Sequence, residues 1–171
     1  MTPQPVKGTR RITLLALLTA IALTIFMIEA QLPVLVPIQG VKLGLANIIT
    51  VYAVFVLGPG DALLILCARV FLGAVFSGQM MTLLYSMGGG LLAWLSMVLL
   101  RKALTRDQIW LCSPAAAVFH NLGQLLVAAG VLKTWAVMAY LPYLLLSGII
   151  TGLFTGLCAQ LLIRRLDRLR R

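Results

Sequence analysis

The fold of this chain is set by the stretch from Ile12 to Ala30, which reads ITLLALLTAIALTIFMIEA. Its one ionisable side chain, Glu29, stands next to its end. A helix rises about 1.5 Å per residue, so roughly 20 apolar residues cross a hydrocarbon core of about 30 Å. The stretch therefore predicts a membrane-spanning helix. The whole chain predicts an integral membrane protein, because 61% of its residues are hydrophobic and only 11% are charged.

Further apolar runs divide the 171 residues into about six helices and leave little material for a separate soluble domain. The segments 58–60 and 77–79, each with glycine, mark turns between runs. The second and third runs are short, so five-span and seven-span alternatives stay open. We predict an all-α bundle in one membrane domain, residues 1–171, with spans at about 12–30, 43–57, 62–76, 80–100, 111–131 and 135–163.

Lysine and arginine residues cluster at alternate ends of these spans. With six spans, eleven of them fall on one side and only Lys42 and Lys133 fall on the other, while Arg69 lies inside a span. The positive-inside rule makes the first side cytoplasmic. We therefore expect the chain in the inner (plasma) membrane with both termini cytoplasmic. The net charge of +10 then reflects topology and contact with the lipid bilayer, and no nucleic-acid partner is expected.

The segment between the first two spans is apolar, yet Pro33 and Pro37 exclude a regular helix through it. Lipid cannot satisfy irregular backbone, so such a segment has to be covered by protein or line a cavity. One interpretation is a lid over an outward-facing pocket. The other is a loop that anchors among the lipid headgroups.

Arg69, near the middle of the third span, is the most informative polar residue. An arginine at this depth costs from about 3 kcal/mol to well above 10 kcal/mol unless it is paired or hydrated. It is therefore expected to face the bundle interior. Glu29 and Asn47 lie toward the outer ends of the first two spans and are expected to reach it. Arg69 either pairs with Glu29 in a structural network or contributes to a ligand pocket.

The fifth span carries a second polar group, His120, Asn121 and Gln124. His120 and Gln124 are four residues apart and share one helix face, with Asn121 beside them. They either bond across helices or line a polar pocket for an anionic or hydrogen-bonding ligand. With one histidine and no cysteine or carboxylate cluster nearby, metal binding is not expected, and no cofactor is predicted.

Small residues recur at a spacing of four on two spans. Ala16 and Ala20 lie near the cytoplasmic end of the first span, and Gly148, Gly152 and Gly156 lie along the sixth span. Such patterns let helices approach closely. They indicate either packing inside the monomer or a docking face for another membrane subunit.

Three motifs carry a resemblance to a known family. They are GVKLGLANI at 40–48, RVFLG at 69–73 and HNLGQ at 120–124. In this order they resemble the bacterial family named heptaprenyl diphosphate synthase component I, also called the Gx transporter family. The resemblance extends from about Arg11 to Leu162. That family is similar to the substrate-binding S components of energy-coupling factor (ECF) transporters, which are six-helix membrane proteins.

The resemblance implies an ECF S-component-like bundle with a pocket near the outer face, capped by the loop after the first helix. It also implies that Ala16 and Ala20 match an A-x-x-x-A pattern that meets a coupling subunit. The residues expected to contact a small-molecule substrate are Glu29, Lys42, Asn47, Arg69, His120, Asn121 and Gln124.

Catalysis by this chain alone is not expected. Prenyl chain elongation usually needs Mg²⁺ held by clustered aspartates, but the four acidic residues, Glu29, Asp61, Asp107 and Asp167, are scattered. No Walker A motif is present for ATP hydrolysis. The first hypothesis is a substrate-binding component of an uptake transporter with separate coupling and ATPase subunits. The alternative is a non-catalytic membrane component of heptaprenyl diphosphate synthase, partnered by a soluble prenyltransferase in menaquinone side-chain synthesis. An ion-coupled carrier acting alone fits less well.

Overall fold

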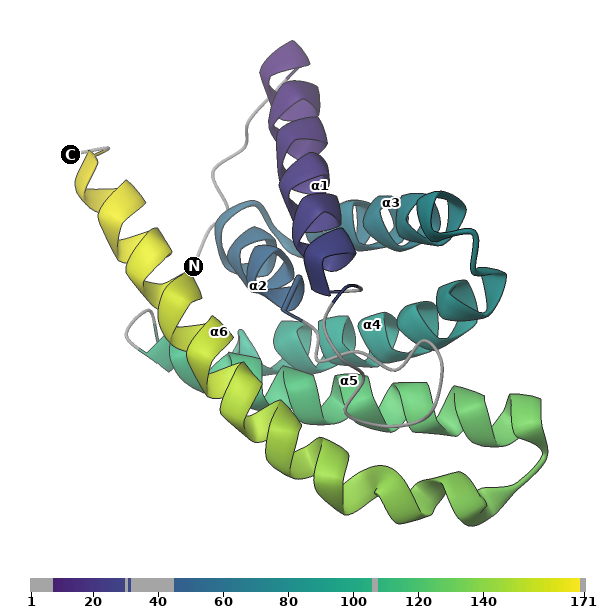
Figure 1. Cartoon of the computed structure of the whole chain (residues 1–171). Coiled ribbons are helices and arrows are strands. Elements are labelled where there is room, and N and C mark those ends of the chain that lie inside the picture. The colour runs from purple at the N-terminus through teal and green to yellow at the C-terminus, as the bar shows by residue number, and fades with distance from the viewer. Residues whose placement is uncertain (1–7, 30, 32–44, 106–107, 170–171) are drawn as a thin grey trace.

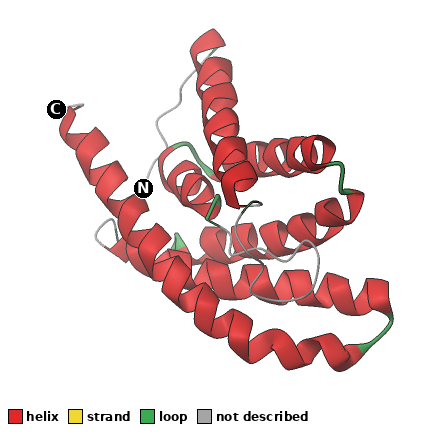
Figure 2. Ribbon diagram, in the orientation of Figure 1, coloured by secondary structure: helices red, strands yellow, loops and turns green. Residues whose placement is uncertain are grey.

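The computed structural model describes residues 8–29, 31, 45–105 and 108–169, with side chains up to residue 165. Every regular element in these parts is a helix, which confirms the predicted all-α class (Figure 2). In chain order the elements are α1 (Thr9–Glu29), α2 (Asn47–Val56), α3 (Pro59–Ser77), α4 (Met80–Leu100), α5 (Ile109–Leu132), the 3-10 helix η2 (Trp135–Tyr140) and α6 (Leu141–Leu169).

Five helical units in the described residues are long and apolar enough to cross a membrane, namely α1, α3, α4, α5 and η2 with α6. The exception is α2, whose 10 residues extend about 15 Å, or half of a hydrocarbon core. The range predicted for this span was 43–57, of which residues 43 and 44 lie outside the described residues. At the other end α2 stops because Gly58 adopts φ 121° and Pro59 begins the next helix.

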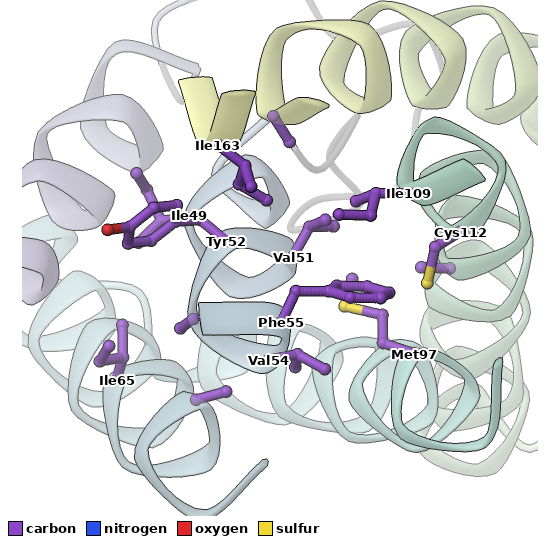
Figure 3. Packing of buried hydrophobic residues seen from close by; sticks show 14 of the residues in the cluster. Ile49, Val51, Tyr52, Val54, Phe55, Ile65, Met97, Ile109, Cys112 and Ile163 are labelled. Carbon is purple, nitrogen blue, oxygen red and sulfur yellow. The ribbon is translucent and has the colours of Figure 1, made fainter. Parts of the chain in front are cut away.

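The short helix α2 forms the centre of the bundle and contacts α1, α3, α4, α5 and α6. It lies between α1 and α6 in Figure 1. All residues from Ile49 to Phe55 are buried. Figure 3 shows Val51 near Ile109 of α5 and Phe55 against Met97 of α4, within one apolar cluster. A helix that is apolar all round is typical of a buried element. Because protein covers α2, its length need not match the bilayer.

The starts of α1 and α3 are joined by an ion pair between Arg11 and Asp61. The Nε of Arg11 donates to Oδ1 of Asp61 at 3.1 Å. Asp61 lies in the first turn of α3, where a negative charge also complements the helix dipole. The pair places both helix starts at the same end of the bundle, as expected for the first and third of a series of alternating spans.

Helices α4, α5 and α6 approach one another through glycines. A Cβ atom added to Gly123 of α5 would lie 2.6 Å from the carbonyl oxygen of Gly88 on α4. One added to Gly152 of α6 would lie 2.6 Å from the Cα of Pro114 on α5. The whole glycine row of α6 is buried against α5: Gly148, Gly152 and Gly156. This row therefore serves packing within the monomer, which is one of the two interpretations drawn from its spacing.

Candidate functional site

The polar side chains predicted to contact substrate are buried wherever the structure describes them. They come from α1, α2, α3 and α5, and each is 0–5% exposed: Glu29, Asn47, Arg69, His120, Asn121 and Gln124. Lys42 and the proposed lid with Pro33 and Pro37 lie outside the described residues. The six described residues constitute the candidate site.

Arg69 of α3 and Glu29 of α1 form the charged part of the site. Both side chains are buried, and the negative charge of Glu29 acts on Arg69. The Oε2 of Glu29 accepts a hydrogen bond from the backbone N–H of Leu45 at 3.1 Å, which ties the end of α1 to the turn before α2. The Nε of Arg69 has no hydrogen-bond partner among the described residues. The site therefore contains a balanced charge and an unused donor.

His120 of α5 lies within the field of Arg69 and faces α4. Its imidazole forms a hydrogen bond with the backbone of Gly89. Gln124, one turn further along α5, lies against the same glycine, since a Cβ added there would be 2.8 Å from Gln124 Cγ. The other ring nitrogen, Nδ1 of His120, is buried and finds no partner in the described parts of the chain. His120 and Gln124 thus share the face of α5 that packs on α4.

Asn121 points toward a different neighbour. Its Nδ2 donates to the carbonyl oxygen of Leu144 on α6 at 2.6 Å, and the amide lies against Gly148. Its Oδ1 is buried without a hydrogen-bond partner among the residues described. Asn121 therefore joins α5 to α6, whereas His120 joins α5 to α4, although the two residues are consecutive in the sequence.

Asn47 opens α2, two residues after the Leu45 N–H that bonds Glu29. It is 4% exposed, and neither Nδ2 nor Oδ1 has a partner within the described residues. An asparagine at the start of a helix often caps it, but the residue that caps α2 is Ala46, and it makes no side-chain hydrogen bond. Asn47 is therefore not the cap of α2, and its amide makes no hydrogen bond to the described residues.

Two backbone groups of the site escaped the sequence reasoning. The backbone of Gly89 bonds His120, and the N–H of Leu45 bonds Glu29. The glycine run 88–90 was a usable signal, because consecutive glycines inside a span indicate a close approach of helices. The N–H of Leu45 gave no signal, because a backbone group is the same at every residue except proline.

The groups in the site are suited to binding. They comprise a guanidinium, a carboxylate, an imidazole and three amides, all enclosed by helices. In the described residues, no three His, Cys, Asp or Glu side chains lie together in a way that would hold a metal ion. Hydrogen bonds and charges in such an interior are strong because little water screens them.

The outer face of α1 presents a second feature. Ala16 and Ala20 are exposed in the monomer, whereas Ala22 on the opposite face is 1% exposed. The hydroxyls of Thr13 and Thr24 flank the two alanines and bond backward to the carbonyls of Thr9 and Ala20, at 3.0 Å and 2.9 Å. The face therefore exposes two small residues, and the hydroxyls of Thr13 and Thr24 are both satisfied within α1.

The region that holds the site coincides with a match to a known family. No curated protein and no solved structure matches this chain. The model of the family described as heptaprenyl diphosphate synthase component I matches residues 18–162, which include all six residues of the candidate site. That match covers more than half of the chain. The chain therefore belongs to the heptaprenyl diphosphate synthase component I family.

Proposed function

We propose that this chain is a non-catalytic membrane component that binds a small polar molecule between α1, α3 and α5. One observation carries the proposal: Arg69 and His120 are buried near each other, and each keeps a ring or guanidinium nitrogen without a partner among the described residues.

Unpartnered polar atoms are costly in a protein interior. Leaving one buried donor or acceptor unsatisfied costs about 1–3 kcal/mol, and more when the group is charged. If these side chains only joined helices, Arg69 Nε and His120 Nδ1 would be expected to form hydrogen bonds. Apolar side chains could also replace them without loss of stability. A bound molecule that satisfies these atoms accounts for their presence. Intramembrane charged residues are commonly functional for this reason.

The acidic residues support the non-catalytic part of the proposal. Asp61 is engaged by Arg11 at the starts of α1 and α3, and Glu29 is engaged by the Leu45 N–H. The other two acids, at positions 107 and 167, are far from both in the sequence. A prenyltransferase reaction needs Mg²⁺ bound through carboxylates and substrate phosphates, which these positions do not suit.

The family match favours one assembly for this component. A member of the heptaprenyl diphosphate synthase component I family is expected to act beside an enzyme, which would here be a soluble prenyltransferase subunit. This was the second of the two hypotheses drawn from the sequence, and the match supports it better than it supports uptake.

The outer face of α1 favours the other assembly, an ECF-like uptake transporter. Exposed Ala16 and Ala20 are small residues at a spacing of four, on which a helix of a coupling subunit would pack closely. In that assembly separate ATPases would drive import of the bound molecule. We place the chain in the inner (plasma) membrane with both termini cytoplasmic, which reporter fusions at Arg171 and near Lys133 would test.

Affinity purification of the tagged chain from its own cells, in mild detergent, tests the assembly. A co-purifying soluble prenyltransferase would support the synthase component, and co-purifying ATPases with a membrane coupling subunit would support uptake. Recovery of both partner types at background level, from cells that express them, would contradict both assemblies. Arg69→Gln tests binding itself: a folded variant that keeps full affinity for the bound molecule would remove the basis of the proposal.

A further inference from the structure

The charges of the site nearly cancel. Arg69 contributes one positive charge, and Glu29 contributes the negative charge that acts on it. His120 is best described as neutral, because a second imidazole proton on Nδ1 would be buried without a partner beside a cationic guanidinium. The described residues of the site therefore carry no net charge to offer a ligand.

The atoms of the site that lack a partner among the described residues include both hydrogen-bond donors and hydrogen-bond acceptors. Arg69 Nε is a donor in every protonation state. Gly89 lies inside α4, where its N–H serves the helix, so His120 donates to its carbonyl and Nδ1 remains an acceptor. Asn121 adds nothing to this set, because its amide faces α6, where Nδ2 donates to the carbonyl oxygen of Leu144. The amide of Asn47 offers one donor group and one acceptor.

From this pattern we infer that the bound molecule is a neutral or zwitterionic compound that both accepts and donates hydrogen bonds, and that it is not a diphosphate. The inference rests on the proposed function and specifies its ligand class. A diphosphate carries several negative charges and is chiefly an acceptor near neutral pH, so it is poorly suited to the acceptors His120 Nδ1 and Asn47 Oδ1. Among the described residues it would also meet a single guanidinium, which Glu29 already balances. Diphosphate chemistry would then belong to a partner subunit.

The test uses the full chain in lipid nanodiscs, with inorganic pyrophosphate as the probe and Arg69→Gln and Ser113→Ala as matched variants. Small molecules that co-purify with each protein are released and identified by mass spectrometry. We expect a compound with N–H or O–H donors and no phosphoryl group. It should be reduced about tenfold or more in Arg69→Gln, because a hydrogen bond to a charged group is lost. Ser113→Ala should retain it. Pyrophosphate should not shift the melting midpoint of the wild-type protein.

The outcomes separate the ligand class from the binding role. A retained phosphoryl compound, or a pyrophosphate-induced rise in melting midpoint that Arg69→Gln abolishes, would overturn the inferred class and leave the binding role standing. The absence both of any compound that depends on Arg69 and of any pyrophosphate response would overturn the binding role, and the class with it. A pyrophosphate response in Glu29→Gln but not in wild type would support the charge balance directly.

Discussion

Helix α5 carries two sets of buried polar groups that differ in one respect. Near its start, Ser113 Oγ lies 2.7 Å from Thr155 Oγ1 of α6, and the backbone N–H of Trp110 donates to Gln160 Oε1 at 3.0 Å. We call these residues the α5–α6 polar cluster. Further along α5, His120 and Asn121 belong to the candidate site, where each leaves one polar atom without a partner among the described residues.

This contrast separates polar groups that hold helices together from polar groups that are candidates for binding a ligand. The side chains of Ser113, Thr155 and Gln160 are 2–5% exposed, as deeply buried as the site residues, so burial alone does not distinguish the two sets. In the α5–α6 polar cluster Thr155 Oγ1 donates to the Gly152 carbonyl at 3.2 Å, so its bond with Ser113 is one that the Ser113 hydroxyl donates. Such a cluster joins helices in a medium where apolar side chains gain nothing from leaving lipid. Incomplete satisfaction, rather than burial, marks the candidate site.

The largest expected effect lies in the charged part of the site. Glu29→Gln leaves Arg69 buried without the charge that balances it, and we expect a loss of about 3–5 kcal/mol of unfolding free energy. Arg69→Gln alone leaves Glu29 uncompensated and should cost a similar amount. The double variant should recover much of the loss, because neither charge then remains. Unfolding by denaturant or heat in one detergent would measure all three.

The matched control for these variants is Gln160→Ala in the α5–α6 polar cluster, which removes an uncharged acceptor from the Trp110 N–H. It should cost about 1–3 kcal/mol, less than either charge removal. Double-variant losses that equal the sum of the single losses would contradict a balanced pair.

A smaller effect is expected from overfilling the contact between α5 and α6. Gly152→Leu introduces a side chain whose Cβ alone would lie 2.6 Å from Pro114 Cα. We expect a loss of about 1–3 kcal/mol, typical of overpacking. Gly130→Leu on the same pair of helices is the control, because a Cβ there meets nothing within 4 Å. Equal melting midpoints for the two variants would show that α5 and α6 do not pack as described.

Removing one polar group from each of the two sets should affect different properties of the protein. Ser113→Ala breaks an interhelical hydrogen bond and should lower stability by about 0.6–1.7 kcal/mol without affecting ligand retention. His120→Phe keeps a ring of similar shape but removes the Nδ1 acceptor, and it should abolish ligand retention. Mass spectrometry of bound compounds and thermal unfolding would be measured together. Normal ligand retention in His120→Phe would place the acceptor outside the binding site.

Much of the fold could be predicted from the sequence because hydrophobic length is a strong signal in lipid. The run that begins at Ile12 is confirmed as part of a long helix, α1 (Thr9–Glu29), since every backbone group must be satisfied within a spanning segment. Helix α2 was less predictable. Its apolar run indicated a span, but whether such a run faces lipid or protein depends on its neighbours. Here five other helices cover it, and it has only 10 residues.

The candidate site could be predicted in its residue types but not in its partners. Arg69, His120 and Gln124 stand out because polar residues are rare in these spans. The spacing of His120 and Gln124 indicated a shared face, and they do share the face toward Gly89. The spacing did not reveal that Asn121, one residue further round α5, bonds α6 instead. Which helix packs on which face is decided by tertiary contacts that no local pattern contains.

The smallest expected effect on the monomer comes from the outer face of α1. Ala16 and Ala20 are exposed, so Ala16→Leu with Ala20→Leu adds apolar side chains to a surface that already faces lipid or a partner. We expect the unfolding free energy of the isolated chain to change by less than about 0.5 kcal/mol. Ligand retention should also be unchanged, because the site residues of α3 and α5 are not altered.

The same double variant should nevertheless prevent assembly if this face docks a partner helix. Close approach would be lost, and association in lipid depends on packing rather than on removal of apolar surface from water. Ala22→Leu on the buried face of α1 is the matched control: it should lower monomer stability by about 1–3 kcal/mol through overpacking. Monomer melting and partner pull-down would be measured in parallel for the three proteins. A double variant that melts at as low a temperature as Ala22→Leu would indicate that both alanines pack within the monomer. One that melts normally and still recovers its partner would exclude this face from the interface.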